Sequence, residues 1–378
     1  MKLAFLYNHE AGHQVRHSAV VIPPLLARYP GAQVTVLATS DYLLDTIRAV
    51  TGDVKCDFVR LDTPAWHKPI ARVLDAALPF SRLDQLYSNR AVFAGFDAVI
   101  VTEGTSLFLK TLGLDLKILR IDHGPGDRAI GFTPSFGRND MVLLPGAKQR
   151  DRFLALGYLK PEQIAVVGYP KFDAVKMAER RKLFADDKPV VLYNPHPEPR
   201  LSSWYDMGEE VLEFFYNSGK YNLIFAPHVM LFKRRMHLTV EGWRARLRRD
   251  LPVKYRDCPH ILIDTGSEAS LDMTYTLAAD IYLGDVSSQV YEFLVKPRPC
   301  VFLDAHATNW EDDPNYAFWH FGRVVKDMVG LERALANAAS DHVLYEPVQS
   351  RAFAATFDTQ GTPSAVRAAD AIAAFLSR

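Results

Sequence analysis

The chain has 378 residues, more than a single hydrophobic core usually organises, so its length favours two domains. Hydrophobic residues make up 48% and charged residues 23%, which excludes a disordered chain and one built mainly of membrane-spanning helices. Lys plus Arg equals Asp plus Glu at 44 each, so no overall positive field favours nucleic acid as a partner.

The cysteines and the N-terminal residues indicate the cellular compartment. The three cysteines form no Cys-x-x-Cys pair, which argues against a disulfide framework and a structural zinc site. The first apolar run ends at Asn8 and is too short for a secretory signal, so we interpret it as a strand. No stretch reaches the roughly 18 apolar residues that a spanning helix needs. The sequence therefore predicts a cytoplasmic protein, with any membrane contact peripheral.

Short apolar, β-branched runs alternate with longer segments of helical period, the pattern of βα units around a mostly parallel sheet. The runs of the first half predict one doubly wound domain. They are 2–7, 33–38, 57–61, 98–102, 117–121, 141–144 and 164–167.

A second series of runs follows the charged stretch 178–189, whose composition suits an exposed connection between folding units. These strands are expected at 190–193, 222–226, 260–263, 280–283 and 299–303. The predicted domains are 1–180 and 186–355, followed by a closing helix within 362–378. The expected fold class is α/β, with two Rossmann-like domains facing a cleft, an architecture called GT-B-like.

His123 stands at the end of the strand predicted at 117–121, and Gly124 and Gly126 follow it. Open α/β folds bind ligands at the carboxyl ends of their strands, and the glycines let a substrate approach the backbone. A histidine there can remove the proton of an attacking hydroxyl. The alternative is a loop histidine bonded to Asp122 or Asp127. The polar loop 10–13, after the first strand, is either acceptor-facing or an ordinary βα turn.

Two more histidines and two cations follow strands in the same way. His228 ends the run 223–228 and is positioned to stabilise a leaving phosphate, or else is structural. His196 lies between prolines that fix it, as a wall of a site or as a plain turn. Lys171 and Arg128 are candidates to neutralise a pyrophosphate, with solvated surface cations as the alternative.

The segment 280–292 combines a strand, a tight turn and a helical pattern. Such a turn exposes backbone N–H groups and the positive end of a helix dipole, which favours an anion. Asp285, Ser287 and Ser288 lie in this turn, and Glu292 is placed to accept hydrogen bonds from a polyol or ribose. The alternative is that these residues only cap the helix.

The order of residues in 280–299 resembles the C-terminal signature of the CDP-glycerol and CDP-ribitol phosphotransferases of teichoic-acid synthesis. Matching fragments fall in the same order at 122–124, 166–173, 190–199 and 223–228, so the resemblance covers roughly residues 118–330. The first hundred residues show no such match. The chain departs from the family pattern at 122–128, at Lys171 and at His196, which leaves the acceptor and the donor alcohol open.

The resemblance implies a transferase that moves a phospho-alcohol unit from a CDP-linked donor to a lipid-linked or polysaccharide acceptor, releasing CMP. It assigns His123 as the base and His228 to the leaving phosphate. The pyrophosphate would be held by Asp285, Ser287, Ser288, Lys171 and Arg128, the donor hydroxyls by Glu292, and the site wall would include Gly124 and His196. The alternative is a UDP- or GDP-sugar glycosyltransferase or epimerase of the same architecture. We expect no cofactor, because the activated donor supplies the chemistry, and no metal, because the 12 histidines show no metal-ligand spacing.

The segment 230–256 is rich in Arg and Lys interleaved with large apolar residues. Such a segment can lie on an anionic membrane surface, which would suit a lipid-linked acceptor. A solvated helix pair that supports the second domain is the alternative. No nucleic-acid-binding fold accompanies these charges, so we expect no nucleic-acid partner.

Overall fold

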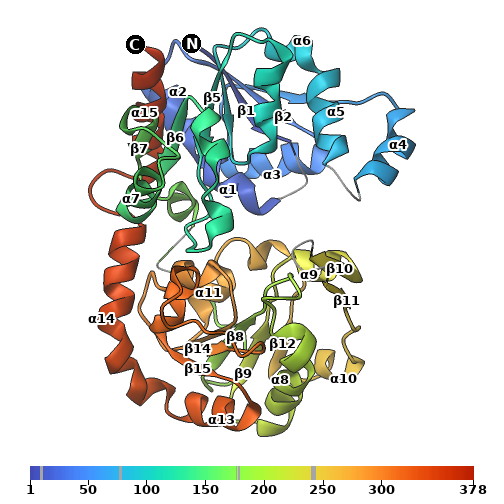
Figure 1. The fold of residues 1–378 in the computed structure, drawn as a ribbon, viewed down its shortest axis with the longest axis vertical. Coiled ribbons are helices and arrows are strands. Elements are labelled where there is room, and N and C mark those ends of the chain that lie inside the picture. The colour runs from blue at the N-terminus through green and yellow to red at the C-terminus, as the bar shows by residue number, and fades with distance from the viewer. Residues whose placement is uncertain (9–11, 76–78, 176, 178, 240–243) are drawn as a thin grey trace. The chain divides into compact units, whose positions relative to one another are not determined.

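The computed structural model describes residues 1–8, 12–75, 79–175, 177, 179–239 and 244–378 (Figure 1). The chain forms two compact units. The first comprises Met1–Pro125, Phe132–Lys176 and Ala354–Arg378, and the second Gly126–Gly131 and Met177–Phe353. Each unit is built around its own parallel sheet, so the predicted α/β class with two Rossmann-like units is confirmed.

The sheet of the first unit has seven strands in the order β3-β2-β1-β4-β5-β6-β7. The order reverses between β1 and β4, where an α/β sheet leaves a crevice at the carboxyl ends of its strands. The strands are β1 (Lys2–Tyr7), β2 (Gln33–Ala38), β3 (Asp57–Arg60), β4 (Ala98–Val101), β5 (Lys117–Ile121), β6 (Met141–Leu144) and β7 (Ile164–Val166).

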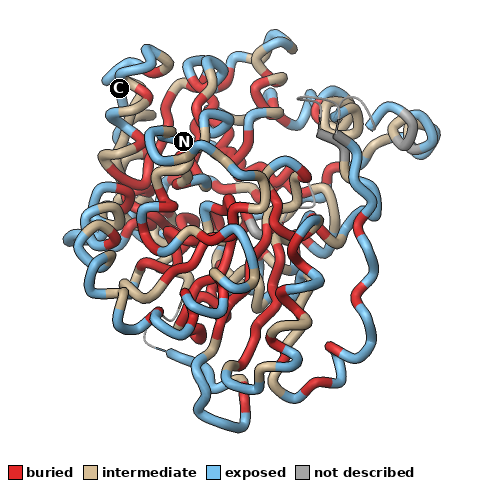
Figure 2. Tube along the Cα trace, turned by 60° about the horizontal axis from the view of Figure 1, so that its bottom comes forward, coloured by how far each residue is buried: buried red, intermediate tan, exposed pale blue. Residues whose placement is uncertain are grey.

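Helices pack on both faces of this sheet, which is why its central strands are continuous apolar runs. Figure 2 shows the buried residues in red along the inner parts of the chain. Along β1, Leu3 and Phe5 pack into one core and Ala4 and Leu6 into the other. The helices of the unit are η1 (Gly12–Gln14), α1 (Val15–Ser18), η2 (Ala19–Val21), α2 (Ile22–Arg28), α3 (Asp41–Thr51), α4 (His67–Leu74), α5 (Phe80–Ser88), α6 (Arg90–Phe93), η3 (Thr105–Leu112), η5 (Pro134–Arg138), α7 (Ala147–Ala155), η6 (Pro161–Gln163), η7 (Pro170–Ala174) and α15 (Ser364–Leu376).

The closing helix α15 belongs to the first unit, although it follows the whole second unit in the sequence. Its Ala368, Ala369 and Ile372 are fully buried and join the core that also contains α2 and β1. Small alanines allow close helix packing, and α15 runs beside α2 (Figure 1). An ion pair of Arg28 with Asp370 at 2.7 Å adds a polar tie between the two helices.

The sheet of the second unit has six strands in the order β12-β9-β8-β13-β14-β15, with its reversal between β8 and β13. The strands are β8 (Val190–Asn194), β9 (Asn222–Phe225), β12 (Ile261–Ile263), β13 (Ile281–Gly284), β14 (Cys300–Leu303) and β15 (Arg323–Val325). The sequence predicted all of these except β15, as it predicted every strand of the first sheet, with ends within one residue.

One face of the second sheet packs against the long amphipathic helix α8, together with α10 and α13. The other face carries Tyr282 and Phe302, whose rings contact Phe293 and Phe318. The helices are η4 (Ala129–Gly131), α8 (Trp204–Ser218), α9 (Met230–Lys233), α10 (Val253–Arg256), η8 (Glu268–Ser270), α11 (Thr274–Ala278), α12 (Gln289–Phe293), η9 (Pro314–Phe321) and α13 (Met328–Ala336); α14 (Ala338–Thr356) spans the boundary of the two units.

The basic segment 230–256 is not the helix pair that was one of its two interpretations. Between the short helices α9 and α10 it forms an antiparallel pair, β10 (Met236–Thr239) and β11 (Arg244–Leu247). Its cations face a row of acids on α8: Arg246 pairs with Asp206 and Arg249 with Glu209, each at 2.8 Å. Lys254 pairs with Glu213 and is the main cause that lowers the pKa of that carboxyl to about 2. Much of the positive charge seen in the sequence is therefore paired.

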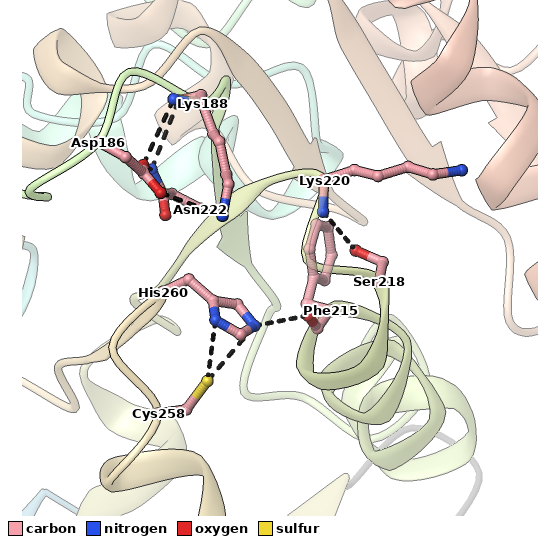
Figure 3. A network of polar contacts seen from close by, with 8 residues as sticks. All are labelled: Asp186, Lys188, Phe215, Ser218, Lys220, Asn222, Cys258 and His260. Atoms are coloured by element: carbon pink, nitrogen blue, oxygen red, sulfur yellow. Dashed lines mark hydrogen bonds and ion pairs between the residues drawn. The ribbon is translucent and has the colours of Figure 1, made fainter.

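Polar contacts close the amino-terminal edge of the second sheet (Figure 3). Nε2 of His260 lies 3.1 Å from the carbonyl oxygen of Phe215, an acceptor, so this nitrogen donates. The sulfur of Cys258 lies 3.3 Å from Nδ1 of the same ring. At the start of β9, Asn222 donates to Asp186 at 2.6 Å. These contacts bind strand ends to neighbouring loops, and we assign them a structural role.

Within the described part of the chain, no helix is both long and apolar enough to cross a bilayer. Among the same residues, no group of three or more His, Cys, Asp or Glu side chains has the geometry to hold a metal ion. Cys258 and Cys300 are buried and Cys56 half-buried, all as free thiols.

Candidate functional site

Three neighbouring strands bring one polar cluster together at the switch point of the first sheet. Gln14 lies in η1 after β1, Thr102 directly follows β4, and His123 follows β5 by two residues. Because β1, β4 and β5 are adjacent and parallel, their carboxyl ends meet at one edge. We call these three residues the His123 cluster.

The hydrogen bonds of His123 define its tautomer. Nδ1 lies 2.7 Å from the carbonyl oxygen of Thr102, which can only accept, so Nδ1 carries the hydrogen. In the neutral ring Nε2 then holds a lone pair, and it lies 3.2 Å from the amide nitrogen of Gln14. The hydroxyl of Thr102 donates to the amide oxygen of Gln14 at 2.7 Å. A base with an available lone pair is the form that proton removal requires.

The loop that carries His123 is shaped by buried groups. The carboxylate of Asp122 accepts the backbone N–H groups of Gly124 and His123, and burial raises its pKa to about 6 against the opposing effect of Arg120. The hydroxyl of Tyr169 donates to the backbone oxygen of His123 at 3.4 Å. The ring of His17 lies 5.8 Å from that of His123. The imidazole of His123 is thus held from several sides at the edge of the sheet.

Three residues predicted for the site belong to the first unit. His123 is half-buried, and its ring nitrogens lie 3.2 Å from the amide nitrogen of Gln14 and 2.7 Å from the carbonyl oxygen of Thr102. Gly124 is exposed, with open space where a side chain would be. Lys171 is 5% exposed in η7, so it is a buried residue of the first unit and not a surface cation. In the loop 10–13, residues 10 and 11 lie outside the described residues.

A second polar cluster forms at the switch point of the second sheet, where β8 and β13 end side by side. Asp285 follows β13 and is 1% exposed. Its carboxylate accepts from the backbone nitrogens of His196, Ser203 and Val286 at 2.9, 2.6 and 2.6 Å, and from the hydroxyl of Ser203 at 2.9 Å. Asp285 therefore closes the loop 195–203 over the ends of the two strands.

These contacts change the role expected for Asp285. A carboxylate that already accepts four protein donors has no reason to contact an anionic phosphate, so we assign it the positioning of His196 and not direct donor binding. Burial raises the pKa of Asp285 to about 6, although the hydrogen bonds from Ser203, Val286 and His196 oppose the shift. The carboxyl is therefore ionised at neutral pH and protonates in mildly acidic solution.

His196 and His228 follow the adjacent strands β8 and β9, and their ring centroids are 6.0 Å apart. Nδ1 of His196 accepts from the backbone nitrogen of Glu198 at 3.1 Å, and Nδ1 of His228 from that of Met230 at 3.3 Å. Each neutral ring therefore carries its hydrogen on Nε2. Burial lowers the pKa of His228 to about 4 and that of His196 well below its usual range. The pair supplies two neutral N–H donors at one sheet edge.

Arg128 adds positive charge to this second cluster. It belongs to Gly126–Gly131, which the structure assigns to the second unit, and it lies 3.4 Å from Glu198. Its charge, after burial and His228, is a further cause of the lowered pKa of His196, so it acts on the same region. The neighbouring Asp127 accepts from the hydroxyl of Tyr291 at 2.5 Å, which fixes the segment. We call His196, His228, Arg128 and Asp285 the His196 cluster.

The turn after β13 differs from the expected anion site. Helix α12 has only five residues, too few to build a substantial dipole. Ser287 is 6% exposed, and its hydroxyl accepts from the backbone nitrogen of Gln289 at 3.3 Å. Ser288 is exposed, and Glu292 is 6% exposed near Tyr282. The N-cap residue of α12 is Ser288, whose side chain makes no capping hydrogen bond, and Ser287 lies one residue before it. Ser288 remains a candidate for contact with a ligand.

Known proteins that match this chain are found among solved structures. No family model and no curated protein matches the chain. Among solved structures, the wall teichoic acid polymerase TagF matches with a TM-score of 0.63 at 12% identity, covering 100% of this chain and 89% of that chain. A putative UDP-N-acetylglucosamine 2-epimerase from Listeria monocytogenes matches with a TM-score of 0.62 at 16% identity, covering 100% and 95%.

This chain has the GT-B fold. A glycotransferase of kitacinnamycin shares it, with a TM-score of 0.59 at 15% identity over 99% of this chain and 98% of that chain. The resemblance of the sequence to teichoic-acid phosphotransferases is thus confirmed as a likeness of fold to TagF. GT-B relatives include transferases and epimerases, so the fold alone leaves the reaction open.

Several residues in or beside the two clusters were not singled out in the sequence. Thr102 was placed only at a strand end, and Gln14 and Ser203 were not considered. Their shared signal is a polar residue after a buried strand, next in the sheet to a strand that ends in a candidate histidine or aspartate. This signal needs the strand order, which periodicity does not provide.

Proposed function

We propose that the protein transfers a phospho-alcohol unit from a CDP-linked donor to a hydroxyl of a lipid-linked or polysaccharide acceptor, releasing CMP. The observation that supports it best is the position of His123 at the sheet edge, with Nδ1 2.7 Å from the carbonyl oxygen of Thr102 and Nε2 3.2 Å from the amide nitrogen of Gln14. The fold of TagF adds support. Structures of that polymerase include a form soaked with CDPG and forms with single histidine substitutions.

The residues can be given roles that balance the reaction. The acceptor oxygen attacks the phosphorus that carries the alcohol, and its proton passes to Nε2 of His123. The bond from this phosphorus to the bridging oxygen breaks, and CMP leaves with that oxygen. The Nε2–H groups of His196 and His228 and the guanidinium of Arg128 stabilise the charge that develops on the leaving phosphate. In this proposal Ser288 adds a hydroxyl donor and Glu292 contacts the donor alcohol. Lys171, predicted to contact the donor phosphates, is buried in the first unit and is given no role.

A nucleotide-sugar glycosyltransferase or epimerase is the second candidate, because such enzymes match the fold with similar TM-scores. Donor diphosphate binding is common to both candidates, while the nucleoside differs.

Thermal unfolding with a nucleotide panel tests the proposal. A ligand at about 100 times its Kd stabilises the native state by about 2.7 kcal/mol. We expect CMP, CDP and CDP-glycerol to raise Tm by a few degrees and UDP or GDP to leave it unchanged. Stabilisation by UDP or GDP alone would move the assignment to a nucleotide-sugar enzyme.

Donor affinity is expected to fall about tenfold between pH 7 and pH 5. Asp285, with its pKa raised to about 6, loses an acceptor for the backbone N–H groups of His196 or Ser203 when it protonates, and roughly one carboxyl in ten stays ionised at pH 5. His228, with its pKa lowered to about 4, remains neutral over this range.

Calorimetry with CDP-glycerol measures this dependence, since both of its phosphates are esterified and keep their charge. An Asp285→Asn variant should bind weakly at every pH, without the fall. Affinity that rises as the pH falls would mean that protonated histidines bind the donor and would contradict the assignment of neutral donors.

We further propose peripheral membrane contact through 230–256. Two exposed apolar side chains support this proposal. Met236 and Leu247 face each other across β10 and β11 and are 57% and 67% exposed. Because Arg246 and Arg249 are paired, we expect these two apolar side chains to contribute most. In flotation with anionic vesicles, replacing both by Ser should lower binding severalfold, while replacing exposed Val343 and Leu344 on α14 should not. Equal flotation of both double variants and the unaltered protein would exclude the hairpin as the contact.

A further inference from the structure

Gln14 occupies a defined position that the proposed chemistry does not yet use. Its side chain lies between the hydroxyl of Thr102 and the imidazole of His123, and the residue is 8% exposed. Thr102 is 2% exposed, so this contact is shielded from solvent. Both ends of the amide are engaged, and its orientation is therefore set by its neighbours.

The orientation of the Gln14 amide follows from the carbonyl oxygen of Thr102, which can only accept a hydrogen bond. The carbonyl of Thr102 fixes the hydrogen on Nδ1 of His123, which leaves Nε2 of the neutral ring to accept. The group facing Nε2 must then be the NH2 of Gln14, so its oxygen faces Thr102, whose hydroxyl donates. As long as His123 is neutral, each hydrogen bond that links Thr102, Gln14 and His123 has only one possible direction.

We propose that Gln14 is a positioning residue for His123: its amide N–H keeps the imidazole unprotonated at Nε2 and is displaced there by the acceptor hydroxyl. A neutral donor to Nε2 favours the neutral ring, because the imidazolium has no lone pair to accept its hydrogen. The amide thus holds the base ready and marks the place of the attacking group. This inference rests on the proposed function, in which His123 is the base.

Other titratable groups around the ring have their own contacts. His17 lies edge-on to His123 and to Tyr169, with ring centroids 5.8 and 5.0 Å away. The carboxylate of Asp122 accepts the backbone N–H groups of the loop, and that of Glu103 accepts those of Thr105 and Ser106. The amide of Gln14 is the group placed directly against Nε2.

Gln14→Glu changes the charge of this group at almost constant shape. A carboxylate facing Nε2 favours the imidazolium, so we expect the pKa of His123 to rise by about one unit or more. With CDP-glycerol as donor, the acidic limb of the kcat profile should move up equally, so that kcat falls by up to about tenfold on the acidic side of the limb and recovers at higher pH. Gln14→Met, of similar length without charge, should lower kcat severalfold with a smaller shift. If Gln14 had only a structural role, both variants would lose stability and kcat, but the acidic limb of the kcat profile would stay at the same pH.

Nitrogen NMR of protein with isotope-labelled histidines measures which ring nitrogens of His123 are protonated and needs no turnover. The signals of His123 are identified by their loss in His123→Gln. We expect Nδ1 protonated and Nε2 unprotonated in the unaltered protein at pH 7, and both protonated in Gln14→Glu. If Gln14→Glu fails to fold, Thr102→Val, which frees the amide to turn, should raise the protonated fraction of Nε2.

The two readings separate the two hypotheses. The expected NMR result without turnover of any CDP-linked donor would leave the Gln14 inference standing and overturn the proposed function. Turnover together with a hydrogen on Nε2 in the unaltered protein, or with a pKa of His123 that Gln14→Glu does not raise, would overturn the inference alone.

Discussion

Replacement of His123 by Gln is expected to lower kcat for transfer by about 10²–10⁴-fold, with little change in donor affinity. A glutamine keeps a donor for the carbonyl oxygen of Thr102, which lies 2.7 Å from Nδ1 in the native protein, but it cannot take a proton. The donor is assigned to the second unit, so its binding should persist. The measurement is steady-state transfer from CDP-glycerol, together with calorimetry of donor binding.

The matched control for this substitution is His320→Gln. His320 is exposed, and its Nε2 contacts only a backbone oxygen, that of Glu311, among the hydrogen bonds described for its ring. We expect kcat of the control within twofold of the native value. A His123→Gln variant that is as active as this control would remove His123 from the reaction.

Asp285→Asn is expected to lower the free energy of unfolding of the second unit by about 1–3 kcal/mol. The carboxylate accepts four donors in a fully buried position. An asparagine turns one acceptor into an NH2 group that faces backbone N–H groups, and leaves buried donors without partners. Chemical denaturation measures the change.

Asp187→Asn is the control for this loss. Its side chain is 92% exposed, and it pairs with Lys182 at 2.7 Å, a surface contact worth little. We expect a change below about 0.5 kcal/mol. If Asp285→Asn is no more destabilising than this control, the carboxylate does not close the loop 195–203 as described.

The strands were predictable because burial on both faces makes each one a short continuous apolar run. Candidate residues at strand ends followed from the same pattern, as for His123, His196 and His228. The order of the strands did not, because periodicity carries no information on which strand lies beside which. Gln14 and Thr102 joined the His123 cluster only once β1 and β4 were seen to be neighbours.

The prediction of a basic surface from the sequence was wrong where the acidic ion-pair partner of an arginine lies far away in the sequence. Arg246 and Arg249 suggested a basic surface, yet their counter-ions, Asp206 and Glu209, lie 40 residues earlier on α8. Asp285 illustrates the converse. Its turn suggested anion binding, while its own donors come from the loop 195–203 of a neighbouring strand.

The most direct test of the proposed transfer is the identity of the nucleotide released when the full-length protein is incubated with CDP-glycerol and an acceptor polymer. Attack at the phosphorus that carries glycerol must release CMP, with one phosphate appearing in each new linkage. We predict CMP in equal amount to glycerol phosphate transferred, and both products about 10²–10⁴-fold more slowly with His123→Gln. If CDP-glycerol stays intact, while a parallel incubation with UDP- or GDP-sugars releases UDP or GDP, the proposal is contradicted and the protein is assigned to the nucleotide-sugar enzymes.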